Sequence, residues 1–365
     1  MIVTAARQHL IEQLTLVGKA LTGKAIHPLV AQYIRLDLRD DGATLYATDL
    51  ETSLTVPLTA SYRKHGTLLL PYRELRKICE HSSAADVTIE MRNASLIVHA
   101  SGMYRFPMPD VADYPMPQQV DSRARYSINN KHLRSAMART EYVTDSGAGR
   151  YAMQGVKMEI AAPYCNVVAT DGRRLSLVTI PCEACDDGPE ECECLVPRRA
   201  AKLLSSLPAT DGDVLMTIGP NSAQFECEAY TLVTLQLEGK FPQWQAVVEK
   251  TNAHVSVDLS PLFLAEAIQR VAVVCTSESP HVTFSINGGT LTLSASTERG
   301  EAQTEIPTQA TKKAEFILDH RYVQQYLESL SSGEAVTLKY KDGNNPTVWS
   351  QDDQYKYLLM PMVRQ

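Results

Sequence analysis

The sequence has no long apolar run. Nowhere in its 365 residues do about 18 uncharged apolar residues follow one another, so no segment is predicted to cross a membrane. The first residues, MIVTAARQHLIEQL, lack the basic region, apolar stretch and small-residue cleavage site of a secretory signal. We therefore expect a cytoplasmic protein whose eight cysteines are thiols or metal ligands rather than disulfides.

The common catalytic signatures are missing as well. The sequence contains no Walker-type phosphate loop, no G-x-G-x-x-G after a strand, no H-E-x-x-H and no G-x-S-x-G. Its nine histidines are scattered and form no evident ligand pair. We expect no catalytic site and no cofactor. A nucleotide-dependent enzyme, which would turn over ATP by itself, is the alternative in the enzyme class.

Signatures of nucleic-acid binding are only partly present. The net charge of −7 argues weakly against nucleic acid as a partner. Aromatic residues do not alternate with basic ones as in single-strand binders, and there is no zinc-finger spacing or recognition helix. Basic residues nevertheless gather in predicted helices, over 71–77, 131–139 and 196–204. These helices either follow DNA phosphates without reading bases or are ordinary solvated helix faces.

An internal repeat is the main feature that the sequence does contain. Its length, with 44% hydrophobic and 21% charged residues, predicts two or three soluble domains. Each third opens with a helical pattern, over 4–21, 127–142 and 257–274, and Thr4 and Ser260-Pro261 are expected at two of the starts. Alternating strand runs follow over 33–58, 155–181 and 282–307, and closing helices over 71–82, 196–208 and 318–330, each with a further hairpin such as 86–109.

This order predicts an α+β chain of three similar domains rather than a chance pseudo-period. Each domain is expected to pack two helices on antiparallel sheets. We place the domains at 1–121, 122–250 and 251–365.

A three-residue word repeats with the domains. ATD stands at 47–49 and again at 169–171, and ASTE at 295–298 is interpreted as a degenerate third copy. Only the middle copy continues as GRR, at 172–174. An aspartate beside two arginines can resemble a phosphate clamp. Asp-Gly between two predicted strands favours a hairpin turn instead, and we adopt that interpretation.

Half of the cysteines lie in one acidic segment, PCEACDDGPEECECL at 181–195. A C-x-x-C followed by C-x-C could supply four thiolates to a zinc ion, from Cys182, Cys185, Cys192 and Cys194. The loop is short for a zinc ribbon and its acids add negative charge, so a reduced, mobile loop without metal is favoured. The other cysteines have apolar neighbours and are expected to be buried thiols: Cys79, Cys165, Cys227 and Cys275.

Several motifs together make the sequence resemble the bacterial sliding clamp family, the β subunit of DNA polymerase III. They match in order and spacing over the full length: ATDLE at 47–51, RY at 150–151 with Gly155, VATDGRRL at 168–175, VPR at 196–198, FP at 241–242 and LMPM at 359–362. The resemblance implies a head-to-tail homodimeric ring of six similar domains, with helices lining a central hole and sheets outside. It implies a non-catalytic processivity factor that encircles duplex DNA.

The resemblance also implies a pocket for short linear peptides between the second and third domains. Its residues would be Met153, Thr170, Gly172, Arg173, Arg174, Leu175, Pro242, Val247, Pro346, Leu358 and Met360. An apolar trough with a few polar groups at its edge suits the Leu and Phe anchors of an extended peptide. Many clamps carry histidine where this chain has Arg173, so its preferred peptide is expected to differ.

Two further sets of residues complete the expectations. DNA contacts are implied by the resemblance for Lys24, Tyr151, Arg198, Arg199 and Lys240, and by charge for Arg73, Lys77, Lys131, Arg134, Lys202 and Arg321. The dimer seam would join Arg105, Phe106 and Met108 to Val273, Val274, Glu298 and Glu301, with core packing as the alternative for Phe106 and Val273.

The expected partners are those of a clamp. They are a second copy, double-stranded DNA of any sequence, the polymerase III catalytic subunit, the clamp loader, other polymerases, mismatch-repair proteins and ligase, with no membrane. The expected location is the cytoplasm, at the nucleoid. Two rivals remain: a specialised second clamp for repair or mobile-element replication, and a scaffolding ring that does not bind DNA.

Overall fold

The computed structural model describes residues 1–21, 29, 32–116, 118–145, 147, 151–185, 189, 191–251, 255–310, 312–330 and 335–362, without the side chains of Tyr151 and Lys250. The chain forms two compact units. Unit 1 contains Met1–Arg134, Cys182–Glu190 and Leu203–Gln236, and unit 2 contains Ser135–Pro181, Glu191–Lys202 and Leu237–Gln365. The boundaries at 1–121, 122–250 and 251–365 stay a prediction.

Unit 1 contains two antiparallel sheets. Their strands are β1 (Ile2–Ala6), β2 (Tyr33–Arg39), β3 (Gly42–Thr48), β4 (Thr52–Leu58), β5 (Ser61–Tyr62), β6 (Gly66–Pro71), β7 (Asp86–Arg92), β8 (Ser95–His99), β9 (Met103–Pro107), β10 (Ala124–Asn129), β14 (Glu183–Cys185), β16 (Asp213–Ile218), β17 (Ser222–Cys227) and β18 (Tyr230–Leu235). One sheet has the order β5-β1-β7-β8-β9, and the other β14-β10-β16-β17-β18-β4-β3-β2-β6.

Unit 2 also contains two antiparallel sheets. Their strands are β11 (Gly155–Ala161), β12 (Tyr164–Thr170), β13 (Arg174–Pro181), β15 (Glu191–Pro197), β19 (Val255–Leu259), β20 (His281–Asn287), β21 (Thr290–Thr297), β22 (Gly300–Pro307), β23 (Ala314–Asp319), β24 (Val336–Tyr340), β25 (Thr347–Ser350) and β26 (Tyr355–Leu359). The orders are β15-β11-β12-β13-β26-β25-β24-β19 and β22-β21-β20-β23.

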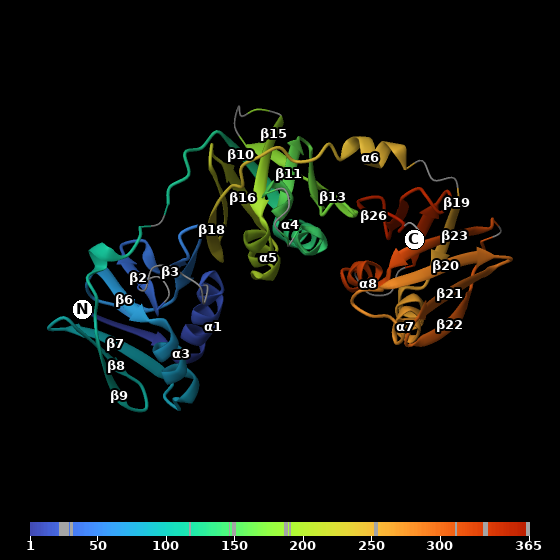
Figure 1. Cartoon of the computed structure of the whole chain (residues 1–365). Helices are drawn as coiled ribbons and strands as arrows, with labels where there is room; N and C mark the ends of the chain where they lie inside the picture. The colour runs from blue at the N-terminus through green and yellow to red at the C-terminus, as the bar shows by residue number, and fades with distance from the viewer. Residues whose placement is uncertain are drawn as a thin grey trace. The chain divides into compact units, whose positions relative to one another are not determined.

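Each helix except α6 (Gln245–Lys250) buries one apolar face, and no described residue of α6 is fully buried. The other helices are α1 (Arg7–Val17), α3 (Tyr72–His81), α4 (Asn130–Thr140), α5 (Arg198–Ser206), α7 (Pro261–Ala272) and α8 (His320–Glu328), with single 3₁₀ turns η1 (Gly18–Ala20), η2 (Val111–Asp113), η3 (Glu141–Val143) and η4 (Tyr151–Gln154). In unit 1, α1 packs against α3, and in unit 2, α7 packs against α8 (Figure 1). Among the described residues no helix is long and apolar enough to cross a membrane.

The strand predictions are confirmed because the residues alternate with period two. In β20, Val282, Phe284 and Ile286 are buried while the residues between them are at least partly exposed. The predicted runs 33–58, 155–181 and 282–307 each contain three consecutive strands, and 86–109 contains β7, β8 and β9. The closing helices are confirmed as α3, α5 and α8.

The ranges predicted for the opening helices begin too early, although the start expected at Ser260-Pro261 is confirmed. Each range begins with the end of a strand, β1, β10 or β19, and the helix starts only at Arg7, Asn130 or Pro261. Thr4 is not an N-cap; it lies in β1, where its hydroxyl bonds that of Thr88 at 2.9 Å. Pro261 does occupy the first turn of α7 as expected, after the N-cap Ser260.

The cysteine-rich segment is more ordered than a loop, because β14 and β15 take up 183–185 and 191–197. Among the described residues, no three His, Cys, Asp or Glu side chains are grouped as metal ligands would be, which gives the zinc hypothesis no support. Cys182 and Cys194 are buried, and burial raises the pKa of the Cys182 thiol to about 11. Cys79 and Cys165 are buried as predicted, but Cys227 and Cys275 are partly exposed.

Candidate functional site

The second ATD word forms the turn between β12 and β13, as predicted. The Asp171 carboxylate accepts hydrogen bonds from the backbone N–H groups of Arg173 at 2.9 Å and Arg174 at 3.0 Å. The Thr170 hydroxyl donates to the carbonyl of Arg174 at 2.7 Å and accepts from the N–H of Gly172 at 3.1 Å. Gly172 has φ 85°, the left-handed region where a side chain is strained. The aspartate is therefore a structural turn residue.

The first ATD word makes the same turn between β3 and β4. Asp49 accepts from the N–H groups of Glu51 at 3.1 Å and Thr52 at 2.7 Å. Thr48 donates to the carbonyl of Thr52, and Leu50 has φ 83° where the second copy has glycine. Identical hydrogen bonding in both copies shows that ATD specifies backbone geometry.

The third copy differs from its predicted alignment. Thr297 ends β21, as Thr48 and Thr170 end β3 and β12, so STE at 296–298 corresponds to ATD and the alignment moves by one residue. Because β22 begins at Gly300, this turn contains one residue fewer than the other two. The N–H of Arg299 bonds the Thr297 hydroxyl at 3.1 Å.

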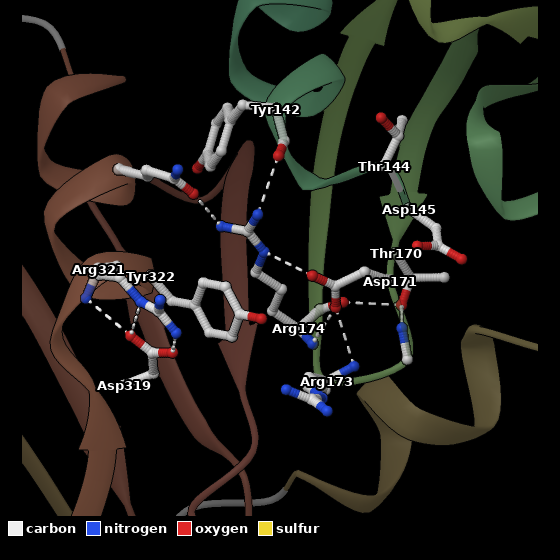
Figure 2. A network of polar contacts seen from close by, with 12 residues as sticks. Tyr142, Thr144, Asp145, Thr170, Asp171, Arg173, Arg174, Asp319, Arg321 and Tyr322 are labelled. Carbon is white, nitrogen blue, oxygen red and sulfur yellow. Dashed lines mark hydrogen bonds and ion pairs between the residues drawn. The ribbon is translucent and has the colours of Figure 1, made fainter. Parts of the chain in front are cut away.

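Arg174 distinguishes the middle copy. Its guanidinium forms an ion pair with Asp171 at 2.9 Å and donates to Gln325 of α8 at 2.6 Å and to the Tyr142 carbonyl at 2.9 Å (Figure 2). It also stacks over the ring of Tyr322, with 4.2 Å from its central carbon to the ring centroid. Burial alone would lower the pKa of Arg174, but its neighbours Tyr357 and Asp171 outweigh burial and raise it. The side chain therefore ties the turn to η3 and α8.

An apolar cavity of about 210 Å³ opens beside this turn. Its floor comes from the ladder between β13 and β26, in which Leu175 lies opposite Leu358. The N–H of Met360 bonds the carbonyl of Arg173 at 2.9 Å and extends the ladder to the rim. Val247 of α6 and Met360 are 40% and 43% exposed, so apolar side chains reach solvent at the mouth.

The structure brings together most of the residues predicted for the pocket. The cavity is lined by Thr170, Gly172, Arg173, Arg174, Leu175, Pro242, Gln243, Trp244, Val247, Pro346, Leu358 and Met360. Met153 does not line it and lies in η4. Gln243 and Trp244 were missed, although they directly follow the Phe241-Pro242 motif.

A second, polar cavity of about 580 Å³ lies on the other side of the turn. It is lined by Tyr142, Thr144, Asp145, Gly147, Asp171, Arg173, Arg174, Arg198, Arg321, Tyr322 and Gln325. Arg321 pairs with Asp319 at 2.6 Å, and Arg198 lies 3.7 Å from Glu141. In Figure 2 the Arg173 side chain extends away from the hydrogen bonds that hold Arg174. Arg173 and Arg174 belong to both cavities.

The basic residues predicted to meet DNA lie mainly on exposed helix faces. Those classed as exposed are Arg73, Lys77, Lys131, Lys202, Lys240 and Arg321. Arg134, Arg198 and Arg199 are partly buried, and burial lowers the pKa of Arg199. Arg134 donates to the carbonyl of Ser205 at the end of α5, at 3.1 Å. Lys24 and the side chain of Tyr151 lie outside the described residues.

The residues predicted for the dimer seam lie on or near two edge strands, β9 and β22. Arg105 and Phe106 belong to β9, which ends its sheet, and Met108 packs against the core of Tyr46, Leu69 and Tyr114. Val273 is 77% exposed, so the core-packing alternative is wrong for it. Glu301 lies on β22, the edge strand of the other unit, and Glu298 in the turn before it. The carbonyl of Val274 accepts from Thr297 at 2.6 Å, next to this turn.

Sequence comparison finds one family along most of the chain. The family described as "DNA polymerase III beta subunit, N-terminal domain" matches residues 1–118, and "DNA polymerase III beta subunit, central domain" matches residues 127–243. Two curated relatives are both called "Beta sliding clamp". The one from Chlamydia pneumoniae is 24% identical over 336 residues, covering 91% of each chain. The one from Pseudomonas aeruginosa is 24% identical over 369 residues, covering 98% of this chain and 99% of the relative.

Solved structures share the fold over the whole length. The DNA polymerase sliding clamp from Bacillus subtilis has a TM-score of 0.90 at 18% identity and covers 100% of both chains. The sliding clamp from Pseudomonas aeruginosa, solved bound to griselimycin, has a TM-score of 0.91 at 23% identity with the same coverage. The α+β clamp fold predicted from the sequence is therefore confirmed.

Proposed function

This chain belongs to the DNA polymerase III beta subunit family, and on that premise we propose that it closes into a homodimeric ring around duplex DNA and tethers partner proteins through the apolar cavity. As a sliding clamp of DNA polymerase III it is a processivity factor and not an enzyme. We place its work in the cytoplasm, at the nucleoid.

The sheet orders carry the ring proposal. The nine-stranded sheet joins a five-strand group ending in β18 to a four-strand group beginning with β4. One five-strand group, ending in β9, and one four-strand group, beginning with β22, have no such partner among the residues that the structure describes. Exposed edge strands are templates for pairing with another chain. Pairing β9 of one copy with β22 of another would recreate the observed nine-stranded pattern.

The ladders also predict the register of that pairing. In the two observed junctions, Val233 lies opposite Ser53 and Leu358 opposite Leu175. In each repeat we start at the residue five places before the opening helix and follow the directly opposite residues from strand to strand across the sheet. This path ends at Arg105 on β9, at Val233 on β18 and at Leu358 on β26, so these three residues occupy equivalent positions. Ser53 and Leu175 occupy the position of Gly300, because each lies opposite the threonine that ends the preceding strand.

The predicted copy-to-copy ladder therefore has Arg105 opposite Gly300 and Tyr104 opposite Glu301. Tyr104 is 40% exposed and Met103 is 65% exposed on the free edge, which is apolar surface that the pairing would cover. These seam residues, with Val273 and Val274 beside the β21–β22 turn, support a head-to-tail contact.

The cavity beside the 170–174 turn supports peptide docking. It is concave, apolar and rimmed by Arg173 and the backbone of the turn, which suits an extended peptide with one or two large apolar anchors. Peptides of this kind would come from the polymerase III catalytic subunit, the clamp loader, other polymerases, mismatch-repair proteins and ligase. The basic residues on the helix faces would supply weak contacts to phosphates, which carry no sequence preference.

Arg173 favours one second candidate within the same family. It lines both cavities, where many clamps carry histidine, and this suits a specialised clamp for repair or mobile-element replication. A pull-down that recovers the replicative polymerase would exclude this candidate.

The peptide pocket is tested by Val247→Asp. A charge in the apolar cavity should weaken binding of a labelled peptide with adjacent Leu and Phe by more than about tenfold. Leu262→Asp is the matched control, because Leu262 is 65% exposed and does not line the cavity. Equal affinity of the two variants, measured by fluorescence anisotropy, would contradict the assignment of the cavity.

A further inference from the structure

Trp244 forms one wall of the apolar cavity at a point where the backbone gives little support. It stands immediately before α6, which has only six residues. Its carbonyl accepts from the N–H groups of Val247 at 3.0 Å and Val248 at 3.1 Å, so the orientation of Trp244 also sets the place of Val247. A helix this short gains little stability from its own hydrogen bonds. Side-chain contacts must therefore fix the wall.

Glu159 supplies those contacts from the sheet. Its carboxylate accepts from the indole N–H of Trp244 at 3.2 Å and from the amide of Gln245 at 3.0 Å. Glu159 lies on β11, between β12 and β15, and its chain neighbours Met158 and Ile160 are fully buried. The carboxylate is thus anchored on a rigid element, and hydrogen bonds to an ionised acceptor are the stronger kind.

Lys157 holds this carboxylate in place. Its ammonium lies 3.0 Å from Glu159 and 2.8 Å from Glu193 of β15. Burial alone would lower the pKa of Lys157, but its hydrogen bonds to the two glutamates outweigh burial and raise it. The result is a chain of polar contacts from β15 through β11 to the start of α6.

The start of α6 separates two cavities. Behind it lies a polar cavity of about 480 Å³, lined by Lys157, Glu159, Ile160, Ala161, Glu191, Cys192, Glu193 and Gln245. On the peptide side, Trp244 packs with Phe241 and Leu195 in the core cluster. On the rear side Gln245 lines the polar cavity, and Glu159 holds both its amide and the indole N–H of Trp244 by hydrogen bonds.

We propose that Glu159 is a positioning residue for the peptide pocket, which holds the indole of Trp244 so that the apolar cavity is already shaped before a peptide arrives. The inference rests on the proposed function of that cavity. A site whose walls are held by outer hydrogen bonds loses affinity when they are removed, because binding must then also order the wall.

The test compares Glu159→Ala, Glu159→Gln and Glu193→Gln in the full chain. The probe is a short fluorescein-labelled peptide with adjacent Leu and Phe. Glu159→Ala should weaken its binding by about fivefold to twentyfold, since both hydrogen bonds to the wall are lost. Glu159→Gln keeps an acceptor for the indole and should stay within about twofold of the parent chain. Glu193→Gln leaves both hydrogen bonds from the wall to Glu159 and the Lys157 contact with Glu159 in place, so it should weaken binding by less than Glu159→Ala.

A second readout follows the wall itself. The chain has two tryptophans, and in a Trp349→Phe background Trp244 alone reports the fluorescence. Glu159→Ala should increase quenching of Trp244 by acrylamide, and Glu159→Gln should not. Equal affinity and equal quenching of Glu159→Ala and the parent would overturn the inference. Absence of binding to the parent chain would instead refute the peptide function, so the two failures are distinguishable.

Discussion

Arg174 serves the fold and the candidate site with a single side chain. It lines the apolar cavity, and its side chain, 6% exposed, joins Asp171, Gln325 and the carbonyl of Tyr142 through the guanidinium. The equivalent residue of the first copy is Thr52, whose hydroxyl bonds only its counterpart Thr234 across the strand junction, at 3.1 Å, among the contacts described for it. In the proposed function, the same turn gains a binding role where a long cation replaces a short hydroxyl.

Removing this cation should be costly. Arg174→Ala leaves the half-buried Asp171 carboxylate without its ion pair, and loss of one partner of a buried pair destabilises by about 3 kcal/mol. Arg173→Ala is the matched control, because Arg173 is exposed, and it should change the free energy of unfolding by less than about 0.5 kcal/mol. Urea unfolding of both variants checks the difference, and similar values would refute a structural role for Arg174.

Buried thiols predict the response to alkaline pH. Burial raises the pKa of Cys79 and Cys182 from 9.0 to about 11, and it raises the pKa of Tyr355 as well. Between pH 9 and 11 the folded chain keeps protons that the unfolded chain releases, so this stabilisation is complete below pH 9 and is lost as the pH rises.

The free energy of unfolding, measured by urea titration, should therefore fall across this range. A Cys79→Ala, Cys182→Ala double variant should show a shallower fall. A stability that rises with pH above 9 would contradict the burial of these thiols.

Among the elements, the strand that follows the ATD turn is the one that joins neighbouring groups of strands in two of the three repeats. β4 pairs with β18 and β13 with β26, whereas β22 has no partner on that edge among the described residues. The equivalent strand thus pairs with a neighbouring group in two repeats, and in the third its edge is unpaired among the described residues.

The open edge gives a prediction about register. Tyr104→Cys with Glu301→Cys should form a disulfide between copies, because directly opposite residues on paired strands bring their Cβ atoms to about 5 Å. Tyr104→Cys with Gln303→Cys, two residues along β22, should cross-link far less. Covalent dimers on a non-reducing gel measure both, and cross-linking of the second pair instead would show a different register.

The helix end beside that edge gives a further prediction. Val273→Asp places a charge on a side chain that is 77% exposed in the single chain and buried in the proposed ring. Light scattering should then give the mass of one chain, 40.3 kDa, in place of two. Leu262→Asp lies on the same helix and should leave the dimer intact, so a dimeric Val273→Asp protein would argue against this seam.

Much of this arrangement could be predicted from sequence, and the errors have physical reasons. β1 and β10 run directly into their helices, so no Gly or Pro marks the change and the helical period was extended backwards into them. Before α7, Ser260-Pro261 does mark the start, and only the range drawn around it began too early. The shift in the third ATD copy arose because its turn is shorter, which similarity of letters does not reveal.

Most of the residues that line the apolar cavity were predicted from motifs with fixed spacing. Trp244 was missed because its role depends on Glu159, which is distant in sequence and supplies the hydrogen bond that orients it.

Across the whole molecule, the distribution of charge is compatible with an acidic protein that works on DNA. The net charge of −7 opposes adsorption to nucleic acid, yet exposed cations such as Arg73, Lys77 and Lys202 lie on helix faces. A ring needs only weak phosphate contacts, because topology rather than affinity keeps it on DNA. Its few direct contacts should weaken steeply with salt, as phosphate contacts do.

The most direct test of this account is retention on DNA of defined topology. The protein is loaded by its clamp loader onto nicked circular DNA, and half of the sample is then linearised before gel filtration at raised salt. The protein should stay with circular DNA and be lost from the linear form. Equal loss from both, or equal retention on both, would contradict a ring that encircles the duplex.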